Sequence, residues 1–264
     1  MDHIIGVDLG QFSSYAAACV LRRTVLYGLG GEPERTSTGA ALCRFDVMAI
    51  RRYALGTEYT SIVSHIVGQA QRPELRGPQG QLPRIFVDGT GVGAPVVELL
   101  KTALLPHPRV ECWAAVITAG RAVTQPKPGT VHVAKQELAG CLRSVLESSR
   151  LRVPRELEFA DALKRELGDF TVKVTQAGNE TYTAEPGQYD DLVICIAIPV
   201  FLSSWLDARL PAILGPGPLA APRERRSGSY AATQGGVLRP HHAPELDRPP
   251  AGCYYLARQR LFDR

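Results

Sequence analysis

The stretch Tyr189-Asp190-Asp191-Leu192-Val193-Ile194-Cys195-Ile196-Ala197-Ile198 joins two adjacent acidic residues to an almost wholly apolar segment. From Leu192 to Leu202 there is no polar face, so a helix formed there is expected to be buried on all sides. Carboxylates at its start would favour the helix by about 0.3 to 1 kcal/mol through the helix dipole. A carboxylate at the mouth of a core, however, rarely lies there unpaired. The stretch therefore predicts a buried helix and directs the search to other carboxylates that could share a divalent metal.

The composition is that of an ordinary folded protein, with 45% hydrophobic and 21% charged residues in a chain of 264. The formal net charge of +4 comes from the last segment, because eight Arg and four acidic residues lie from Gly215 onward and leave 22 basic and 22 acidic residues before it. That segment is dense in Pro, Gly and Arg, so little packed structure is expected in it. We predict one domain over residues 1–210 and a poorly ordered tail over residues 215–264.

Cysteine usage and hydropathy favour a soluble protein. The six Cys show no spacing typical of zinc ligands and mostly lie in apolar runs, which predicts reduced core thiols. No signal-peptide pattern opens the chain, and the apolar run ending near Leu202 is shorter than the roughly 20 residues that span a membrane. We therefore expect a cytoplasmic protein with no membrane contact.

Hydrophobic periodicity predicts an α/β fold with a mixed sheet. Strands are expected over residues 3–8, 15–21 and 43–53, and their succession indicates an antiparallel meander. A helix over residues 60–71 follows. The strand over 84–88, the helix over 92–104 and the strand over 110–117 form a right-handed crossover, which makes the two strands parallel. Helices over 134–149 and 157–167 and a strand over 170–174 precede the buried helix.

Four carboxylates occupy the ends of predicted elements. Asp8 closes the first strand, Asp88 closes the fourth, and Asp190 with Asp191 opens the last helix. In a sheet where the first and fourth strands are parallel neighbours, these carboxylates share one edge. Two unit charges about 4 Å apart repel by roughly 4 kcal/mol at an effective dielectric of 20. Protonation or a metal must therefore intervene, and an all-oxygen ligand set favours Mg²⁺ or Mn²⁺.

A pair of such ions suits in-line cleavage of a phosphodiester. Each acid taken alone also has a purely structural explanation. Asp8 could cap a turn, Asp88 could begin the glycine turn, and the pair Asp190 and Asp191 could cap a helix. The order and placement of all of them favour a nuclease.

Three segments carry a resemblance to a known family: GVDLGQFSSYAA, IFVDGTGVGAPVVELL and YDDLVICIAIPVFL. Together with the run VAKQELAGCLRSVLESSRLRVPRELEFADALKRELGDFTVKV, they resemble the nuclease domain of the large terminase subunit of tailed phages. The resemblance covers roughly Ile4 to Leu206. It implies an RNase H-like sheet flanked by helices, and an endonuclease that cuts DNA in the cytoplasm of a bacterium or phage-infected host.

By this likeness Asp8 bridges two Mg²⁺ or Mn²⁺ ions, Asp88 and Asp191 each hold one, and Asp190 assists or caps. Two positions depart from the family pattern: Tyr189 stands where the family often has His, and Ile194 stands where related enzymes can have another acid. The resemblance also implies a portal or small terminase subunit as partner. No GxxxxGK[ST] motif occurs in the sequence, so ATP binding is not expected.

Three other readings of the sequence stay open. Gly89 to Ala94 match the GxGxxG/A pattern of a dinucleotide site, although Asp88 would repel a pyrophosphate. GVDLG also resembles a phosphate loop of actin-like proteins, which need two such domains. A catalytically silent nucleic-acid-binding or assembly module is the remaining alternative, and the apolar Ile194 is compatible with it.

Several basic side chains are candidates for holding phosphates, although single surface cations are usually only solvated. They are Arg51, Arg52, Arg121, Lys127, Lys135, Arg223, Arg225 and Arg226. Arg51 and Arg52 alternate faces of a strand, so at most one of them points into any one site. His65 is expected at a helix surface, and His241 with His242 in the tail.

Overall fold

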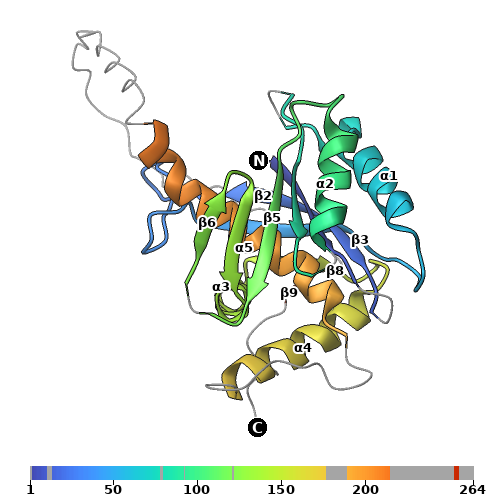
Figure 1. Ribbon diagram of the computed structural model, residues 1–264. Coiled ribbons are helices and arrows are strands. Elements are labelled where there is room, and N and C mark those ends of the chain that lie inside the picture. Colours follow the sequence, from blue (N-terminus) through green and yellow to red (C-terminus); the bar gives the residue numbers. More distant parts are fainter. Residues whose placement is uncertain are drawn as a thin grey trace, which may run out of the picture.

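A nine-stranded mixed sheet organises the protein, whose computed structural model describes residues 2–10, 14–77, 80–91, 93–120, 122–176, 189–214 and 253–255. The strand order across the sheet is β6-β7-β5-β4-β1-β2-β3-β8-β9 (Figure 1). The strands are β1 (Asp2–Asp8), β2 (Ala17–Val25), β3 (Cys43–Arg52), β4 (Arg84–Asp88), β5 (Cys112–Thr118), β6 (Thr124–Lys127), β7 (Thr130–Ala134), β8 (Leu151–Pro154) and β9 (Cys253–Tyr255).

Strand directions confirm the predicted mixed, RNase H-like arrangement. The first three strands form the antiparallel meander, β1 with β2 and β2 with β3. On the other side of β1, the strands β4, β5 and β7 follow in parallel, and β8 is parallel to β3. Outside the meander, β6 and β9, at the two edges, pair antiparallel with their neighbours. The strands β1, β3, β4, β5, β7 and β8 consequently all run in one direction.

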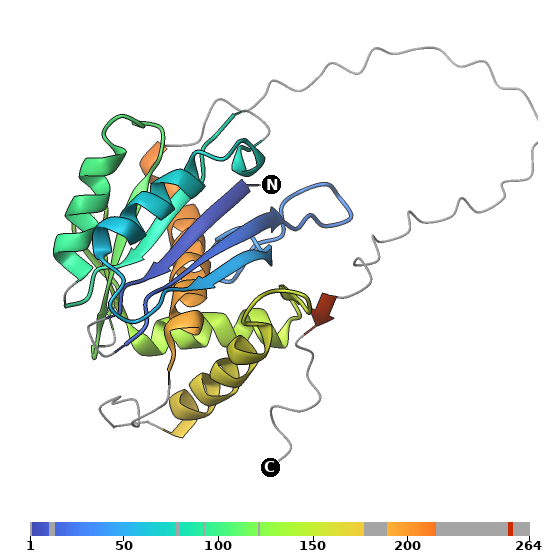
Figure 2. The same cartoon turned by 90° about the vertical axis from the view of Figure 1, so that its right-hand side faces the viewer.

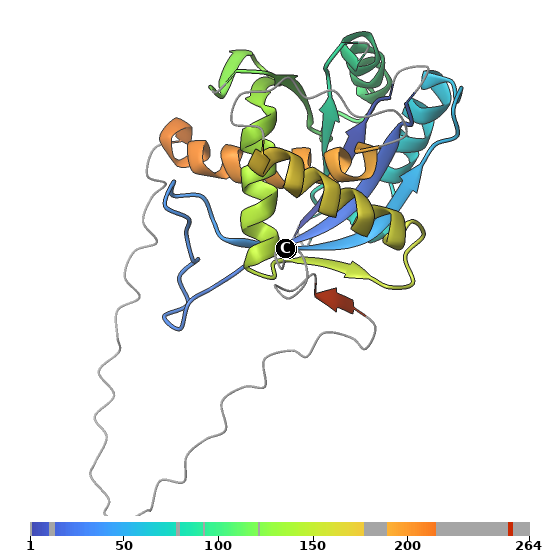
Figure 3. The same cartoon turned by 90° about the horizontal axis from the view of Figure 1, so that it is seen from below.

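Helices cover both faces of the sheet (Figure 2). The helices are α1 (Tyr59–Ala70), α2 (Gly93–Leu104), α3 (Lys135–Glu147), α4 (Ala160–Gln176) and α5 (Asp191–Leu214), with a single 3₁₀ turn, η1 (Pro73–Leu75). On one face α1 and α2 pack side by side. On the other face α5 lies against β1 to β4, and α3 and α4 cross it, as Figure 3 shows from below.

The alternation of side chains along β1 explains why two separate cores form. Ile4 belongs to the core under α5, whereas Ile5 and Val7 belong to the core under α1 and α2. Successive strand residues point to opposite faces, so an uninterrupted apolar strand buries both sides. By the same alternation, Asp8 points to the α5 face.

Close contact between α5 and β1 depends on Gly6 and on a proline inside the helix. A Cβ atom at Gly6 would lie 1.8 Å from the Cys195 carbonyl oxygen and 2.6 Å from the Pro199 ring. Because Pro199 has no N–H, the carbonyl of Cys195 lacks its usual helical donor. The Cys19 thiol donates to that carbonyl instead, at 3.0 Å. The helix therefore continues past Pro199 while its backbone touches the sheet.

The length of α5 differs from the sequence-based expectation. The helix has 24 residues rather than ending near Leu202, and its Asp191–Arg209 part is long and apolar enough to cross a membrane by length and composition alone. However, 78% of that part is buried inside the protein. Its hydropathy is accounted for by its place between the sheet, α3 and α4, which is that of a core helix.

The other differences from the sequence-based expectation concern strands. The prediction of a strand from Phe170 to Val174 is wrong, because α4 runs through this segment to Gln176. The short strands β6, β7 and β8 were not predicted. In the predicted tail, Cys253–Tyr255 pair with β8, while residues 215–252 and 256–264 lie outside the described residues. The division into residues 1–210 and 215–264 stays a prediction.

Candidate metal centre

Charged residues collect at the edge where the parallel strands end. Asp8, Arg52 and Asp88 are the last residues of β1, β3 and β4, and Lys135 directly follows β7. Since these strands run in one direction, their carboxyl ends meet at the same edge of the sheet. Open α/β sheets commonly bind ligands just outside this edge. The start of α5, with Asp190 and Asp191, lies at the same edge, because both its carboxylates act on Asp8.

Asp8 and Asp88 are in direct contact. The parallel register pairs Val7 with Val87, so the two following carboxyl groups emerge from neighbouring strands, where each affects the pKa of the other. Burial raises the pKa of Asp8 well above its usual value, and repulsion from Asp88 and Asp190 adds to this. The pKa of Asp88 is also raised, mainly by burial. Two negative charges are therefore unfavourable at this pair unless a proton or a cation compensates them.

Asp190 precedes α5 and faces this pair. Its backbone carbonyl accepts the first helical hydrogen bond, from Ile194 N at 2.8 Å. Its carboxylate Oδ2 accepts from the Lys135 Nζ at 2.7 Å. The position before the helix was predicted for Asp190, whereas the pairing with Lys135 was not.

Asp191, the first residue of α5, is held away from solvent by Arg52. The guanidinium donates through Nε to Asp191 Oδ2 at 2.8 Å and through Nη2 to Oδ1 at 3.1 Å. Nη2 also contacts Glu166 of α4, whose second carboxylate oxygen accepts from Leu192 N at 3.1 Å. Asp191 is 4% exposed. One guanidinium thus joins β3, α4 and the start of α5.

The charges of this group do not balance, since one guanidinium faces two carboxylates. Burial raises the pKa of Glu166 to about 7, and repulsion from Asp191 adds to this against the influence of Arg52. Burial also raises the pKa of Asp191, although the Arg52 hydrogen bonds oppose the rise. A proton on Glu166 near neutral pH makes the group neutral overall.

Aromatic rings enclose the Arg52 guanidinium. Its central carbon lies 5.1 Å from the centre of the Tyr15 ring, 5.6 Å from that of Tyr189 and 5.9 Å from that of Phe159. The Tyr15 and Tyr189 rings meet edge to face at 4.8 Å. Cations over aromatic faces are stabilised by about 0.5 to 2 kcal/mol. Tyr189, the position where the resembled family often has His, therefore packs on this cation.

The structure places Asp8 beside Asp88, leaves Asp190 close enough to influence Asp8 electrostatically, and ties Asp191 to Arg52. Among the residues that the structure describes, no three His, Cys, Asp or Glu side chains lie close enough together to hold one metal ion. Sequence reasoning missed Glu166. A signal was present, because Glu166 shares the helical stripe of the buried Leu163, Leu167 and Phe170, where an acid needs a partner.

The glycines after Asp88 have local structural reasons. A Cβ atom at Gly93 would lie 2.3 Å from the Asp88 carbonyl oxygen, and Gly91 has a φ of 57°. Asp88 Oδ1 accepts from Thr90 N at 2.8 Å, and the Thr90 hydroxyl accepts from Ile117 N at 2.8 Å. The loop thus folds tightly onto Asp88 and β5. An acidic group capping this loop disfavours a pyrophosphate there.

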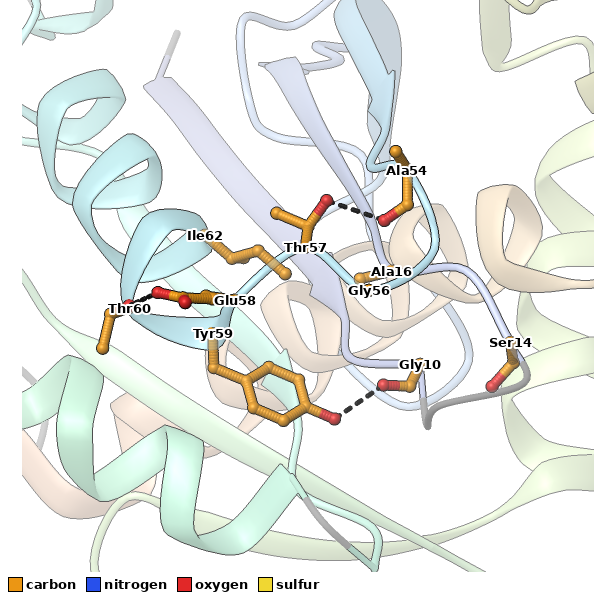
Figure 4. Close-up of a pocket in the computed structure, with 10 residues that line it drawn as sticks. All are labelled: Gly10, Ser14, Ala16, Ala54, Gly56, Thr57, Glu58, Tyr59, Thr60 and Ile62. Carbon is orange, nitrogen blue, oxygen red and sulfur yellow. Dashed lines mark hydrogen bonds between the residues drawn. The ribbon is translucent and has the colours of Figure 1, made fainter.

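A pocket of about 410 Å³ opens at the same end of β1, but on the α1 side of the sheet (Figure 4). Its lining consists of Gly10, Ser14, Ala16, Ala54, Gly56, Thr57, Glu58, Tyr59, Thr60 and Ile62. The Tyr59 hydroxyl donates to the Gly10 carbonyl at 2.8 Å, and the Thr57 hydroxyl to the Ala54 carbonyl at 2.7 Å. Asp8 points to the opposite face, so the pocket is separate from the carboxylates.

The other candidate cations are dispersed. Arg51 is exposed and lies over the Tyr53 ring, on the face opposite Arg52, as strand alternation predicted. Lys127 is exposed on β6. The ring of His65 is hydrogen-bonded to the Tyr53 hydroxyl at 2.6 Å. The remaining candidates lie outside the described residues: Arg121, Arg223, Arg225, Arg226, His241 and His242.

Comparison with known proteins finds similarity to solved terminase nuclease domains. The human cytomegalovirus domain is 14% identical over 78% of this chain and 85% of its own, with a TM-score of 0.42. The large terminase nuclease of thermophilic phage G20c is 17% identical over 75% and 80%, with a TM-score of 0.39. A Mn-soaked cytomegalovirus domain is 12% identical over 78% and 85%, with a TM-score of 0.42. No protein-family model and no curated protein matches the sequence significantly.

Proposed function

We propose that the protein is a divalent-metal-dependent endonuclease that hydrolyses DNA phosphodiester bonds. The observation that carries the proposal is the contact between the Asp8 and Asp88 carboxyl groups at adjacent strand ends, with Asp190 facing them. Two carboxylates in contact and raised in pKa are a costly arrangement in a purely structural role. Such clustered perturbed acids at the carboxyl edge of a sheet are typical of functional sites.

The donor chemistry of this pair fits Mg²⁺ or Mn²⁺. Both ligands are carboxylate oxygens, and Mg²⁺ is usually bound through one or two carboxylates together with substrate phosphates. A cation there would compensate two carboxylates whose negative charges burial and mutual repulsion make unfavourable. When bound, the ion would supply Lewis acidity for hydrolysis of the phosphodiester.

The resemblance implies two ions, with Asp8 shared and a second ligand from the start of α5. Asp190 is the better placed of the two adjacent acids, because its side chain is 39% exposed, whereas the Asp191 carboxylate is 5% exposed and is bound by Arg52. Asp191 contributes indirectly, since its bidentate contact with Arg52 fixes the first turn of α5. We therefore assign Asp8, Asp88 and Asp190 to the metal, and Asp191 to positioning.

DNA is the proposed substrate because the sequence motifs resemble those of terminase nucleases. A portal or small terminase subunit as partner, and location in the bacterial or infected-host cytoplasm, follow from the same resemblance. ATP has no role in the proposed reaction. Figure 2 shows the helix pair α1 and α2 on the face of the sheet opposite α5, and the candidate centre lies at the carboxyl edge of the strands.

Plasmid cleavage tests the proposal. The full chain is incubated with supercoiled plasmid and Mn²⁺ or Mg²⁺, alongside Asp8→Asn, Asp88→Asn and the control Asp161→Asn, an exposed acid on α4. We expect cleavage by the wild type and the control, a loss of at least 100-fold in both site variants, and none with EDTA. Equal cleavage by all four proteins would contradict the assignment of the site.

A silent nucleic-acid-binding module is the second candidate function. It is favoured by the two ion pairs, Lys135 with Asp190 and Arg52 with Asp191, which neutralise half of the four predicted ligands internally. In that case the wild type binds plasmid DNA in a gel-shift assay and leaves it intact with either metal.

A further inference from the structure

Lys135 lies among the carboxylates of the candidate metal centre. It is the first residue of α3 and follows β7, whose end lies at the same edge of the sheet as Asp8 and Asp88. The Lys135 Nζ is 2.7 Å from Asp190 Oδ2 and 5.7 Å from the centre of the Phe170 ring. The side chain is 24% exposed. An ion pair and an aromatic face thus hold the ammonium in place.

The charge of Lys135 also acts on Asp8. Burial, Asp88 and the α5 acids raise the pKa of Asp8, and Lys135 is the group that opposes them. The ammonium therefore faces both Asp190, which it contacts, and the carboxyl pair. Asp190 is thus already paired with a cation, and it is the acid from which a second divalent ion would have to displace the ammonium.

Electrostatics decides between the ammonium and a second ion. A divalent ion at Asp8 and Asp88 together with the Lys135 ammonium brings three positive charges to three carboxylates. A further divalent ion bound by Asp190 next to the ammonium would be repelled by it, and the repulsion is strong at a partly buried site because the effective dielectric is low. While Lys135 stays on Asp190, a second ion is therefore excluded.

We propose that Lys135 is a positioning residue that serves as the built-in cation of this centre, holding Asp190 and limiting the DNA-free protein to one divalent ion at Asp8 and Asp88. The inference rests on the proposed function, because it takes the carboxyl pair as a metal site. It goes beyond the proposed function because it states how many divalent ions the protein binds without DNA and names Lys135 as the residue that determines this number.

Metal counting without DNA tests the inference. Mn²⁺ is titrated into the full chain and followed by calorimetry and by the electron paramagnetic resonance signal of free Mn²⁺. We expect one bound ion for the wild type and for Lys135→Arg, which keeps the positive charge. Lys135→Met is expected to bind two, because Asp190 becomes available. The control Lys101→Met removes a lysine that is paired with Glu98 on α2, and it is expected to bind one.

A double variant tests whether the second Mn²⁺ ion expected in Lys135→Met binds through Asp190. Lys135→Met with Asp190→Asn is expected to return to one ion, and thermal melting of each variant verifies folding. Two ions on the wild type, or one ion on a folded Lys135→Met, would overturn the role of Lys135. No ion on any of the proteins would instead overturn the metal site itself, and the proposed function with it.

Discussion

Arg52 illustrates how one side chain orders the edge of the sheet that carries the candidate centre. Its guanidinium is 14% exposed, contacts Asp191 and Glu166, and lies between the rings of Tyr15 and Tyr189. Removing one partner of a buried ion pair leaves the other charge without compensation. The site acid Asp190 is next in the chain to Asp191, so the orientation of the centre depends on this cation.

We predict that Arg52→Met lowers the free energy of unfolding by about 3 to 5 kcal/mol, because two buried carboxylates lose their cation. Urea unfolding followed by circular dichroism measures the loss. Arg51→Met is the matched control on the opposite face of β3, where only a contact with the Tyr53 ring is lost, and its cost should stay under about 1 kcal/mol. Similar losses in both variants would contradict the role given to Arg52.

Glu166 should make stability depend on pH in a definite direction. Its pKa is about 7 in the folded protein, above the ordinary value of 4.5. Between these values the folded state keeps a proton that the unfolded state has released. The contribution to stability is therefore fully present below about pH 4.5 and is lost as the pH rises through 7.

We predict that Glu166→Gln reduces the fall in unfolding free energy between pH 5 and pH 8 by on the order of 1 to 3 kcal/mol. Denaturant titrations at the two pH values measure it. Glu147→Gln, an exposed change on α3, should leave the fall as it is in the wild type. An unchanged fall in Glu166→Gln would show that Glu166 ionises normally in the folded protein.

At the scale of elements, local sequence patterns predicted the helices and strands whose bounds are set by neighbouring residues. They failed for a segment whose structure is set by tertiary contacts. β4 was predicted at its observed bounds, Arg84–Asp88, because an apolar run ends at an acid and a glycine turn. Phe170 to Val174 alternate like a strand, yet α4 continues through them, since Phe170 extends the stripe that packs under α5. Tertiary packing here outweighs β propensity.

The arrangement of the four carboxylates was likewise predicted only in part. Asp8 and Asp88 were predicted to meet because strand order and direction place them there. The partners of Asp190 and Asp191 were not predicted, because the predicted strand order did not include β7, which precedes Lys135, and did not place Arg52 beside the last helix. Which of two adjacent acids faces a site depends on which cation reaches it, and a helix that is apolar all round offers no face to decide it.

The contact of α5 with β1 is predicted to be sensitive to a single methyl group. Gly6→Ala should lower the unfolding free energy by about 1 to 3 kcal/mol or more, because its Cβ would overlap the Cys195 carbonyl. Gly68→Ala in α1 is the control: a Cβ there meets nothing within 4 Å, and helix propensity predicts a gain of up to about 1 kcal/mol. Thermal melting compares the two, and a stable Gly6→Ala would mean that α5 is less closely packed on β1 than described.

At the scale of the whole molecule, the carboxyl pair opposes stability for the sake of the site. Without metal, Asp8→Asn should stabilise the protein by on the order of 1 kcal/mol, since it removes a buried acid that faces Asp88. With Mn²⁺ at 100 times its dissociation constant, the wild type should gain about 2.7 kcal/mol and the variant nothing. Melting temperatures with Mn²⁺ and with EDTA measure both effects. A metal-induced shift that survives in Asp8→Asn would place the ion elsewhere.

The Cys19 thiol donates a hydrogen bond to the Cys195 carbonyl, so two buried cysteines lie at the contact between α5 and the sheet. Their reactivity can report when this contact opens. Cys19 and Cys195 are 1% and 0% exposed, and burial raises the pKa of the Cys195 thiol well above its usual value. An alkylating reagent attacks the thiolate, so neither sulfur reacts until α5 separates from β1 and β2. The rate at which they are labelled then measures how often the central helix leaves the sheet, a quantity that fraying of the shorter edge strands does not affect.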